Sequence, residues 1–273
     1  CKMQKLTATL CLTIAVFLGS AGVSDSADYQ KGLAAYKSGD FATTLREWTP
    51  LAEQGDARAQ FNIGTMYFRG RGVPKDNKTA VKWFRLSAEE GYANAQFSLG
   101  VMYDNGKGVP KNSTSAVKWY SLAARQGNAS APHNLGVMYR TGNGVPKDYK
   151  TALKWYRIAA ERGNAGSAFT LGLMYNNGDG VSQDNKEAEK WFRLAAEQGN
   201  ISAQFNLGKM YYFGNGVQQD DVYAHMWWNI VASSGDKDAV TLKDAVSKRM
   251  TSSQIEKAQD LARECVHKKY KGC

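Results

Sequence analysis

The sequence predicts an all-α fold, a solenoid of stacked antiparallel helix pairs, and three observations carry this prediction. Tryptophan, glycine and tyrosine each recur every 36 residues, and no insertion or deletion interrupts the period. A fixed period of about 20–50 residues is the signature of a repeat architecture in which each unit stacks on the next. The tryptophans of the series are Trp83, Trp119, Trp155, Trp191 and Trp227. We therefore place five units at residues 56–91, 92–127, 128–163, 164–199 and 200–235.

Each unit is predicted to contain two helices. In the first unit, residues 56–69 place Ala59, Ile63 and Met66 at the spacing of one helical face. Gly64 lies inside this helix, where glycine costs about 1 kcal/mol relative to alanine. Because glycine recurs at this place in all five units, we expect a neighbouring element to approach closely there.

The loop between the two helices carries stop and start signals. Gly70 and Gly72 can adopt the left-handed conformation that ends a helix. Asp76 is then a suitable N-cap for a second helix over residues 77–90. The same cap position recurs as Asn112, Asp148, Asp184 and Asp220.

The second helices suggest how the units hold together. A single pair of short helices cannot bury its own aromatic face, so we expect the recurring tryptophans to be buried as a ladder along the solenoid. On the outer face, an arginine and a glutamate one turn apart should form weak ion pairs. These predicted pairs are Arg85–Glu89, Arg157–Glu161 and Arg193–Glu197.

The two ends depart from the repeat, as the caps of a solenoid must. Residues 28–55 are predicted to form an N-terminal capping helix pair, and residues 236–273 to form C-terminal capping helices. Thr251 and Gln254 have the spacing of a capping box, which opens the last helix. In an oxidising compartment Cys265 and Cys273 should form a disulfide, whereas in a reducing cell they would remain free thiols.

Residues 1–27 have the pattern of a cleaved signal peptide. Lys2 and Lys5 precede an apolar stretch of 13 residues, 6–18, and small residues follow it. A membrane anchor is the alternative, but a span needs about 20 apolar residues. We expect cleavage near residues 21–27 and a periplasmic or secreted bacterial protein.

The chain is basic, with a formal net charge of +10. Such a charge favours nucleic acid, anionic lipid or acidic polysaccharide, and export argues against nucleic acid. A row of lysines on the second helices, Lys82, Lys118, Lys154 and Lys190, could hold an anionic glycan or a lipid head group. A solvated outer face is the plainer interpretation of the same row.

The repeated motif resembles the Sel-one-like repeat family, a relative of the tetratricopeptide repeats. The residues that carry the resemblance are A-x-A-Q-F-N-L-G-x-M-Y, then G-x-G-V-x-x-D, then A-x-K-W-F-R-L-A-A-E-Q-G. They cover about residues 28–249 in consecutive copies. The resemblance implies a right-handed superhelix and an adaptor or scaffold role, without naming a partner.

In solenoids of this kind the first helix of each pair lines the concave surface. The inward stripe of the first unit would be Arg58, Phe61, Thr65, Phe68 and Arg69. The equivalent positions vary in later units while the framework stays constant. They vary either because they determine partner specificity or because nothing constrains them, and we take them as the candidate contact residues. The further candidates are Asp104, His133, Arg140, Asn176, Lys209 and Tyr212.

His133 stands where the other units carry phenylalanine, directly after Pro132. A histidine in a groove can sense pH or contact a ligand, but a solvated substitution in a first helical turn is the plainer interpretation and the one that we favour. His225 and His267 lie far away in sequence. Without paired ligand spacing we expect no metal site.

An enzyme is the main alternative to a scaffold, because cysteine-rich members of the family have been linked to penicillin binding. Ser115–Lys118 and Ser234–Lys237 fit S-x-x-K, but neither K-T-G nor S-D-N accompanies them. A calcium loop at Asn177, Asp179 and Asp184 has no counterpart in the sister loops. We therefore predict no catalytic residues, no cofactor and no enzyme, but a monomeric scaffold that binds a protein or peptide in its concave groove.

Overall fold

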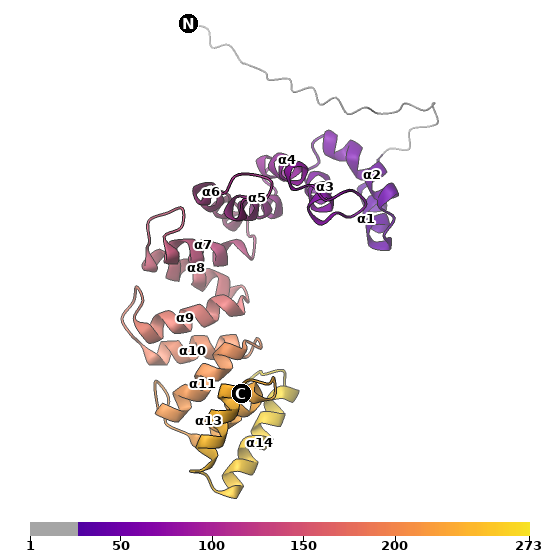
Figure 1. Ribbon diagram of the computed structural model, residues 1–273. Coiled ribbons are helices and arrows are strands. Elements are labelled where there is room, and N and C mark those ends of the chain that lie inside the picture. Colours follow the sequence, from indigo (N-terminus) through magenta and orange to yellow (C-terminus); the bar gives the residue numbers. More distant parts are fainter. Residues whose placement is uncertain (1–26) are drawn as a thin grey trace, which may run out of the picture.

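The computed structural model describes residues 27–273 and forms fourteen helices and no strand within that range. Consecutive helices pack side by side, except that the last helix packs on the helix two positions before it, and the pairs follow one another along an arc (Figure 1). The helices are α1 Tyr29–Ser38, α2 Phe41–Glu53, α3 Ala57–Arg69, α4 Asn77–Glu89, α5 Ala93–Asn105, α6 Ser113–Arg125, α7 Ala131–Thr141, α8 Tyr149–Glu161, α9 Ala165–Asn177, α10 Asn185–Ala196, α11 Ile201–Phe213, α12 Asp221–Ala232, α13 Lys237–Ser247 and α14 Ser252–His267. The predicted fold class, an all-α solenoid of helix pairs, is confirmed.

The predicted helix ends are also confirmed. The carboxylate of Asp76 accepts hydrogen bonds from the backbone N–H groups of Lys78 and Thr79 at the start of α4. Gly70, with φ of 68°, ends α3 and donates its N–H to the carbonyl of Met66. Side-chain caps of this kind satisfy backbone groups that a helix end leaves without partners.

The recurring glycine of each first helix faces an aromatic ring of the second helix in the same pair. A Cβ atom on Gly100 would stand 2.7 Å from the ring of Tyr120, so any side chain larger than hydrogen would collide. The other facing pairs are Gly32–Trp48, Gly64–Phe84, Gly136–Tyr156, Gly172–Phe192 and Gly208–Trp228. The expected close approach is confirmed, and the approaching element is a ring.

The predicted burial of the tryptophan series is wrong for four of its five members. Trp227 is fully buried, but the other four are half-buried. The fully buried aromatic is the residue that follows each tryptophan, because that residue points at the glycine of its own pair. The tryptophan points sideways instead: Trp119 packs against the core formed by Leu99 of its own helix pair and Phe84 of the preceding pair. One edge of its indole therefore stays in contact with solvent.

The outer-face arginines join neighbouring units. Arg85 donates from its guanidinium to the hydroxyl of Tyr103 in the next unit, at 2.8 Å. The same bond links Arg157 to Tyr175 and Arg193 to Tyr211. None of the three predicted Arg–Glu pairs forms within residues 27–273. The tyrosine ring is fixed by packing, whereas an exposed glutamate would lose side-chain entropy on pairing. Arg193 also pairs with Glu189, a largely covered glutamate on its own helix.

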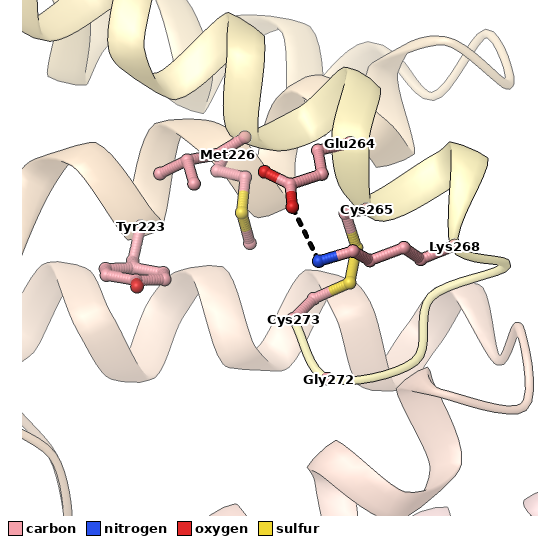
Figure 2. A pocket seen from close by; sticks show the side chains of 8 residues that line it. Tyr223, Met226, Glu264, Cys265, Lys268, Gly272 and Cys273 are labelled. Atoms are coloured by element: carbon pink, nitrogen blue, oxygen red, sulfur yellow. Dashed lines mark ion pairs between the residues drawn. A yellow bond between two sulfur atoms is a disulfide. The ribbon is translucent and has the colours of Figure 1, made fainter.

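The C-terminal helix folds back on the last unit. α14 begins at Thr251, whose side chain and that of Gln254 form the predicted capping box. Cys265 and Cys273 are joined by a disulfide with their Cα atoms 5.6 Å apart. Figure 2 shows the disulfide beside Tyr223 and Met226 of α12. The loop it closes therefore holds the end of α14 against the fifth unit.

The segment predicted to be a signal peptide lies, apart from Ala27, outside the described residues. Within the described range, no helix has both the length and the apolar character that a membrane span requires.

Candidate binding face

The first helices of the five units, α3, α5, α7, α9 and α11, expose one side of each pair, which we call the A face. Near its N-terminal end, α3 and α5 enclose an open hollow of about 340 Å³. We call this the A-face hollow. Its lining comprises Phe61, Thr65, Phe68, Arg69, Phe84, Phe97, Ser98, Val101 and Met102. Four of the five residues of the predicted α3 stripe thus line the A-face hollow.

Aromatic rings form the floor of the hollow. The ring centroid of Phe84 lies 5.7 Å from that of Phe61 and 6.5 Å from that of Phe68. Phe84 is buried because it faces Gly64, while Phe61 and Phe68 are half-buried and remain accessible. Thr65 donates its hydroxyl to the carbonyl of Phe61. The surface offered to a ligand is therefore largely apolar.

Positive charge lies at the rim of the hollow. Arg69 is exposed at the end of α3. The ammonium of Lys107, in the next loop, lies 5.9 Å from the ring centroid of Phe68, within the range of a cation–π contact. Asp104 is the nearby acidic candidate, and it is half-buried. The rim thus favours a ligand that carries negative charge.

The predicted member Arg58 is directed elsewhere. Its guanidinium lies 4.4 Å from the ring centroid of Tyr29 and 3.1 Å from a carboxylate oxygen of Asp56. It thus contacts the N-terminal capping pair, outside the A-face hollow. Its position on the same helical stripe does not bring it to the same site.

Two candidate specificity residues have structural partners inside their own units. Asp104 accepts a hydrogen bond at 3.5 Å from the hydroxyl of Tyr120, and Arg140 donates at 3.3 Å to the hydroxyl of Tyr156. Burial, and then the charge of Asp104, raise the pKa of Tyr120. In the first unit the buried ring, Phe84, has no hydroxyl, and the equivalent position is the aromatic Phe68. Part of the variation at this position therefore follows the buried aromatic.

His133 is packed into the fold, so the interpretation as a solvated substitution is wrong. Its ring centroid lies 5.8 Å from that of Tyr156, and its Nδ1 lies 2.8 Å from the hydroxyl oxygen of Ser167 in the next unit. It occupies the place that Phe97 and Phe169 occupy in their units. Burial, and then the charge of Arg140, lower the pKa of His133.

The remaining candidates lie toward the C-terminal end of the A face. Asn176 donates to the side chain of Asn177, and Lys209 is exposed on α11. Tyr212 is covered by the guanidinium of Arg249, 4.3 Å from its ring centroid. These residues belong to helices α9 and α11, so the eleven predicted residues do not form one site.

The residues of the hollow or its rim that sequence reasoning missed include Phe84, Phe97 and Lys107. Phe97 could have been found, because it repeats Phe61 one period later. Phe84 was missed because we expected the preceding residue, Trp83, to be the buried aromatic residue. Lys107 lies in a loop whose path the period alone does not specify.

The residues weighed for catalysis and metal binding have ordinary structural roles. Ser115 lies in the first turn of α6, where its N–H bonds to the cap residue Asn112. Ser234 donates its hydroxyl to the carbonyl of Val231. Asp184 caps α10. Among the described residues, no group of three or more His, Cys, Asp or Glu side chains is arranged to hold a metal ion.

The stacked helix pairs define a helical-repeat protein, and the A-face hollow is its candidate binding site. The Sel1 repeat profile matches five consecutive segments, residues 57–92, 93–128, 129–164, 165–200 and 201–236. The chain belongs to the Sel1 repeat family, as the resemblance implied. Each match begins one residue later than the unit that we placed from the tryptophan period. Proteins of this family generally act as scaffolds for protein–protein interaction.

A solved structure with 33% sequence identity agrees with this assignment. A Sel1 repeat protein from Oxalobacter formigenes is 33% identical, with a TM-score of 0.75, and the match covers 87% of this chain and 99% of that one. A protective antigen of uropathogenic Escherichia coli is 24% identical, with a TM-score of 0.42 and 89% and 84% coverage of the two chains. The immunity protein Pa5087 of Pseudomonas aeruginosa is 20% identical, with a TM-score of 0.44 and 80% and 83% coverage. No curated protein is similar enough to this chain to count as a match.

Proposed function

We propose that this protein is an exported scaffold that binds an acidic protein segment in the A-face hollow, with one large apolar side chain of that segment as the anchor. The observation that carries the proposal is the aromatic floor of the hollow, in which Phe61 and Phe68 are accessible and rest on the buried ring of Phe84. Burying a large apolar side chain on such a floor contributes about 1.5–3 kcal/mol. Anchors of this kind carry most of the energy at protein interfaces.

The charge preference follows from the rim. Arg69 and Lys107 can both approach a carboxylate beside the anchor, and hydrogen bonds to charged groups contribute about 1.5–3 kcal/mol when water is excluded. Asp104 opposes them, but it is already bonded to Tyr120. A segment with an aromatic or leucine residue flanked by acidic residues therefore suits the hollow best.

The test selects short displayed peptides on the immobilised protein and measures the affinity of the enriched sequences. Enrichment of an apolar anchor with acidic neighbours is expected. Phe68→Ala and Arg69→Glu should each weaken binding about tenfold, equivalent to about 1.4 kcal/mol. Arg125→Glu, on the exposed end of α6, is the matched control and should leave the affinity unchanged. Arg140 is not used in this test, because its guanidinium donates a hydrogen bond to the hydroxyl of Tyr156 and its replacement would also remove that structural contact.

Two results would contradict the proposal. Peptides that bind the Phe68→Ala and Arg69→Glu variants as tightly as the original protein would place the site elsewhere. Selection of basic peptides would contradict the charge argument. Helical circular dichroism of each variant separates loss of binding from loss of fold.

The export part of the proposal is supported by the apolar stretch of residues 6–18 and by the disulfide between Cys265 and Cys273, since disulfides persist in oxidising compartments. Expression of the full chain in a bacterial host should yield a product in the envelope or medium that lacks the first 21–27 residues. Its mass should rise by two hydrogens on reduction. An uncleaved product in the cytosol would contradict export without affecting the binding proposal.

A further inference from the structure

A second hollow lies on the other side of the helix pairs, where α4 meets the loop that follows α5. It has a volume of about 480 Å³, and we call it the B-face hollow. Val81, Leu86 and Val109 provide its apolar wall, and Lys78, Lys82 and Arg85 provide its polar groups. We propose that this hollow binds a single aliphatic carboxylate, with the chain on the apolar wall and the carboxylate among the three cations.

The charges of the lining are all of one sign. No acidic side chain and no neutral polar side chain contributes to the wall. The guanidinium of Arg85 is held in place by its bond to Tyr103, at 2.8 Å. A guanidinium has five N–H donors in a rigid fork, so one bond to the tyrosine leaves it able to bind a carboxylate. Lys78 and Lys82, one turn apart on the same helix, add their charges at the mouth.

The apolar part of the wall is incompletely covered by the protein. Leu86 keeps 46% of its surface exposed, which is unusual for a leucine in a packed helix pair. Covering such a side chain with an aliphatic chain gains hydrophobic free energy. A peptide suits the hollow less well, because its amide groups would lose water without neutral polar side chains to replace it.

The neighbouring units explain why one free molecule, rather than a membrane surface, is the expected ligand. In the second unit Thr114 and Ser121 replace Lys78 and Arg85. In the fourth unit Glu189 replaces Val81 and pairs with Arg193, while Lys190 pairs with Glu187. The lysine row of the second helices is therefore not a continuous basic strip. The second and fourth units thus lack the combination of apolar wall and clustered cations that the first unit has.

The third unit repeats the first at five of these positions, with Lys150, Leu153, Lys154, Arg157 and Ile158. The third unit is therefore a second candidate site for the same ligand. The fourth unit, with its internal ion pairs, serves as a natural negative example. Copying Glu189 of the fourth unit into the first unit gives a variant that should lose binding, and an equivalent change in another unit gives its control.

The experiment titrates the full chain with decanoate and follows the methyl NMR signals of Val81, Leu86 and Val109. Saturable shifts of these methyl groups are expected, and decanol should bind at least tenfold more weakly because it lacks the charge. Val81→Glu, which copies Glu189 of the fourth unit, should weaken binding at least tenfold. Leu86→Ser and Lys82→Gln change exposed side chains and should also weaken it, so that the test does not depend on one variant.

Lys118→Gln, the equivalent change in the second unit, is the matched control and should leave the decanoate affinity of the first unit unchanged. The proposal is overturned if decanoate moves none of the three methyl signals, if decanol binds as tightly, or if Leu86→Ser and Lys82→Gln leave the affinity unaltered. Binding of acidic peptides to the A-face hollow is measured separately, so failure of either proposal leaves the other in place.

Discussion

The ring of Tyr156 lies directly against Gly136: a Cβ atom at that glycine would stand 2.7 Å from two carbons of the ring. The contact sets the spacing between α7 and α8. The same contact recurs in every unit, with Phe, Tyr or Trp as the facing residue. One glycine position therefore allows the two helices of each pair to pack closely. The cost of glycine within a helix is thereby offset by close packing.

Replacement of this glycine should destabilise the protein despite better helix propensity. Gly136→Ala gains about 1 kcal/mol of propensity but forces the Tyr156 ring to move in a filled core, which typically costs about 1–3 kcal/mol or more. We expect a net loss of about 1–2 kcal/mol in the free energy of unfolding, measured by urea denaturation.

Gly166→Ala is the matched control for this prediction. Gly166 also lies in a helix, but a Cβ atom there would meet no atom closer than 3.4 Å. The substitution should be neutral or stabilise by up to about 1 kcal/mol, since alanine lowers the entropy of the unfolded chain. Equal losses for the two variants would show that the ring contact is not what excludes alanine at Gly136.

The bonds between arginine and tyrosine couple one unit to the next. Tyr175→Phe removes the acceptor of Arg157 and should cost about 0.5–1.5 kcal/mol, the usual net value of such a bond. The chain provides a control in Tyr139, because Ser121 stands where an arginine partner would be. Tyr139→Phe should therefore cost less than Tyr175→Phe in thermal and urea unfolding. The reverse order would contradict a coupling role for the arginines.

The units and helix ends were predictable because each depends on local and periodic signals. Asp76, Gly70 and Gly64 act within their own helix pair, and their period of 36 residues places every copy. The depth of the aromatic residues was not predictable in the same way. Trp83 and Phe84 are adjacent in sequence and both apolar, so burial depends on which one faces the glycine in three dimensions.

The candidate site was predictable in part for a related reason. Helical spacing placed Phe61, Thr65, Phe68 and Arg69 on one face, and they share one hollow. Helical spacing did not show that Arg140 donates a hydrogen bond to the hydroxyl of the buried Tyr156. That contact depends on which aromatic residue the unit buries. Helical spacing therefore groups candidate residues, but it does not separate ligand contacts from structural ones.

Stability should fall as the pH falls below about 6.5, the ordinary pKa of histidine. The pKa of His133 is lowered in the folded protein, mainly by burial. A depressed histidine pKa means that the fold favours the neutral form. Its contribution is present above the unfolded pKa and is lost as the pH falls toward the folded value. His225, which is buried in α12, acts in the same direction.

His133→Phe copies Phe97 and Phe169 and should remove part of this dependence. Urea unfolding at about pH 7.5 and about pH 5 brackets the histidine range and lies above most carboxyl titrations. The variant should lose less stability between the two conditions than the original chain does. An unchanged loss would assign the dependence to His225 or other groups.

The disulfide should act locally, because a solenoid unit contacts only its neighbours. Closing a loop of this length contributes about 2–3 kcal/mol by chain entropy. The closed loop also holds Gly272, whose N–H donates to the carboxylate of Glu197 at the end of α10. Cys273→Ser should therefore loosen α14 and its contact with the fourth unit, while helices near the N-terminal end stay protected.

Hydrogen exchange measured along the chain distinguishes this local effect from global destabilisation. In the Cys273→Ser variant, amide protection should fall in α14 and remain unchanged in α3 to α6. A reducing agent should reproduce the change in the original chain and add nothing to the variant. Uniform loss of protection across all units would instead mean that α14 supports the whole stack, since cooperative unfolding exposes every amide with the same free energy.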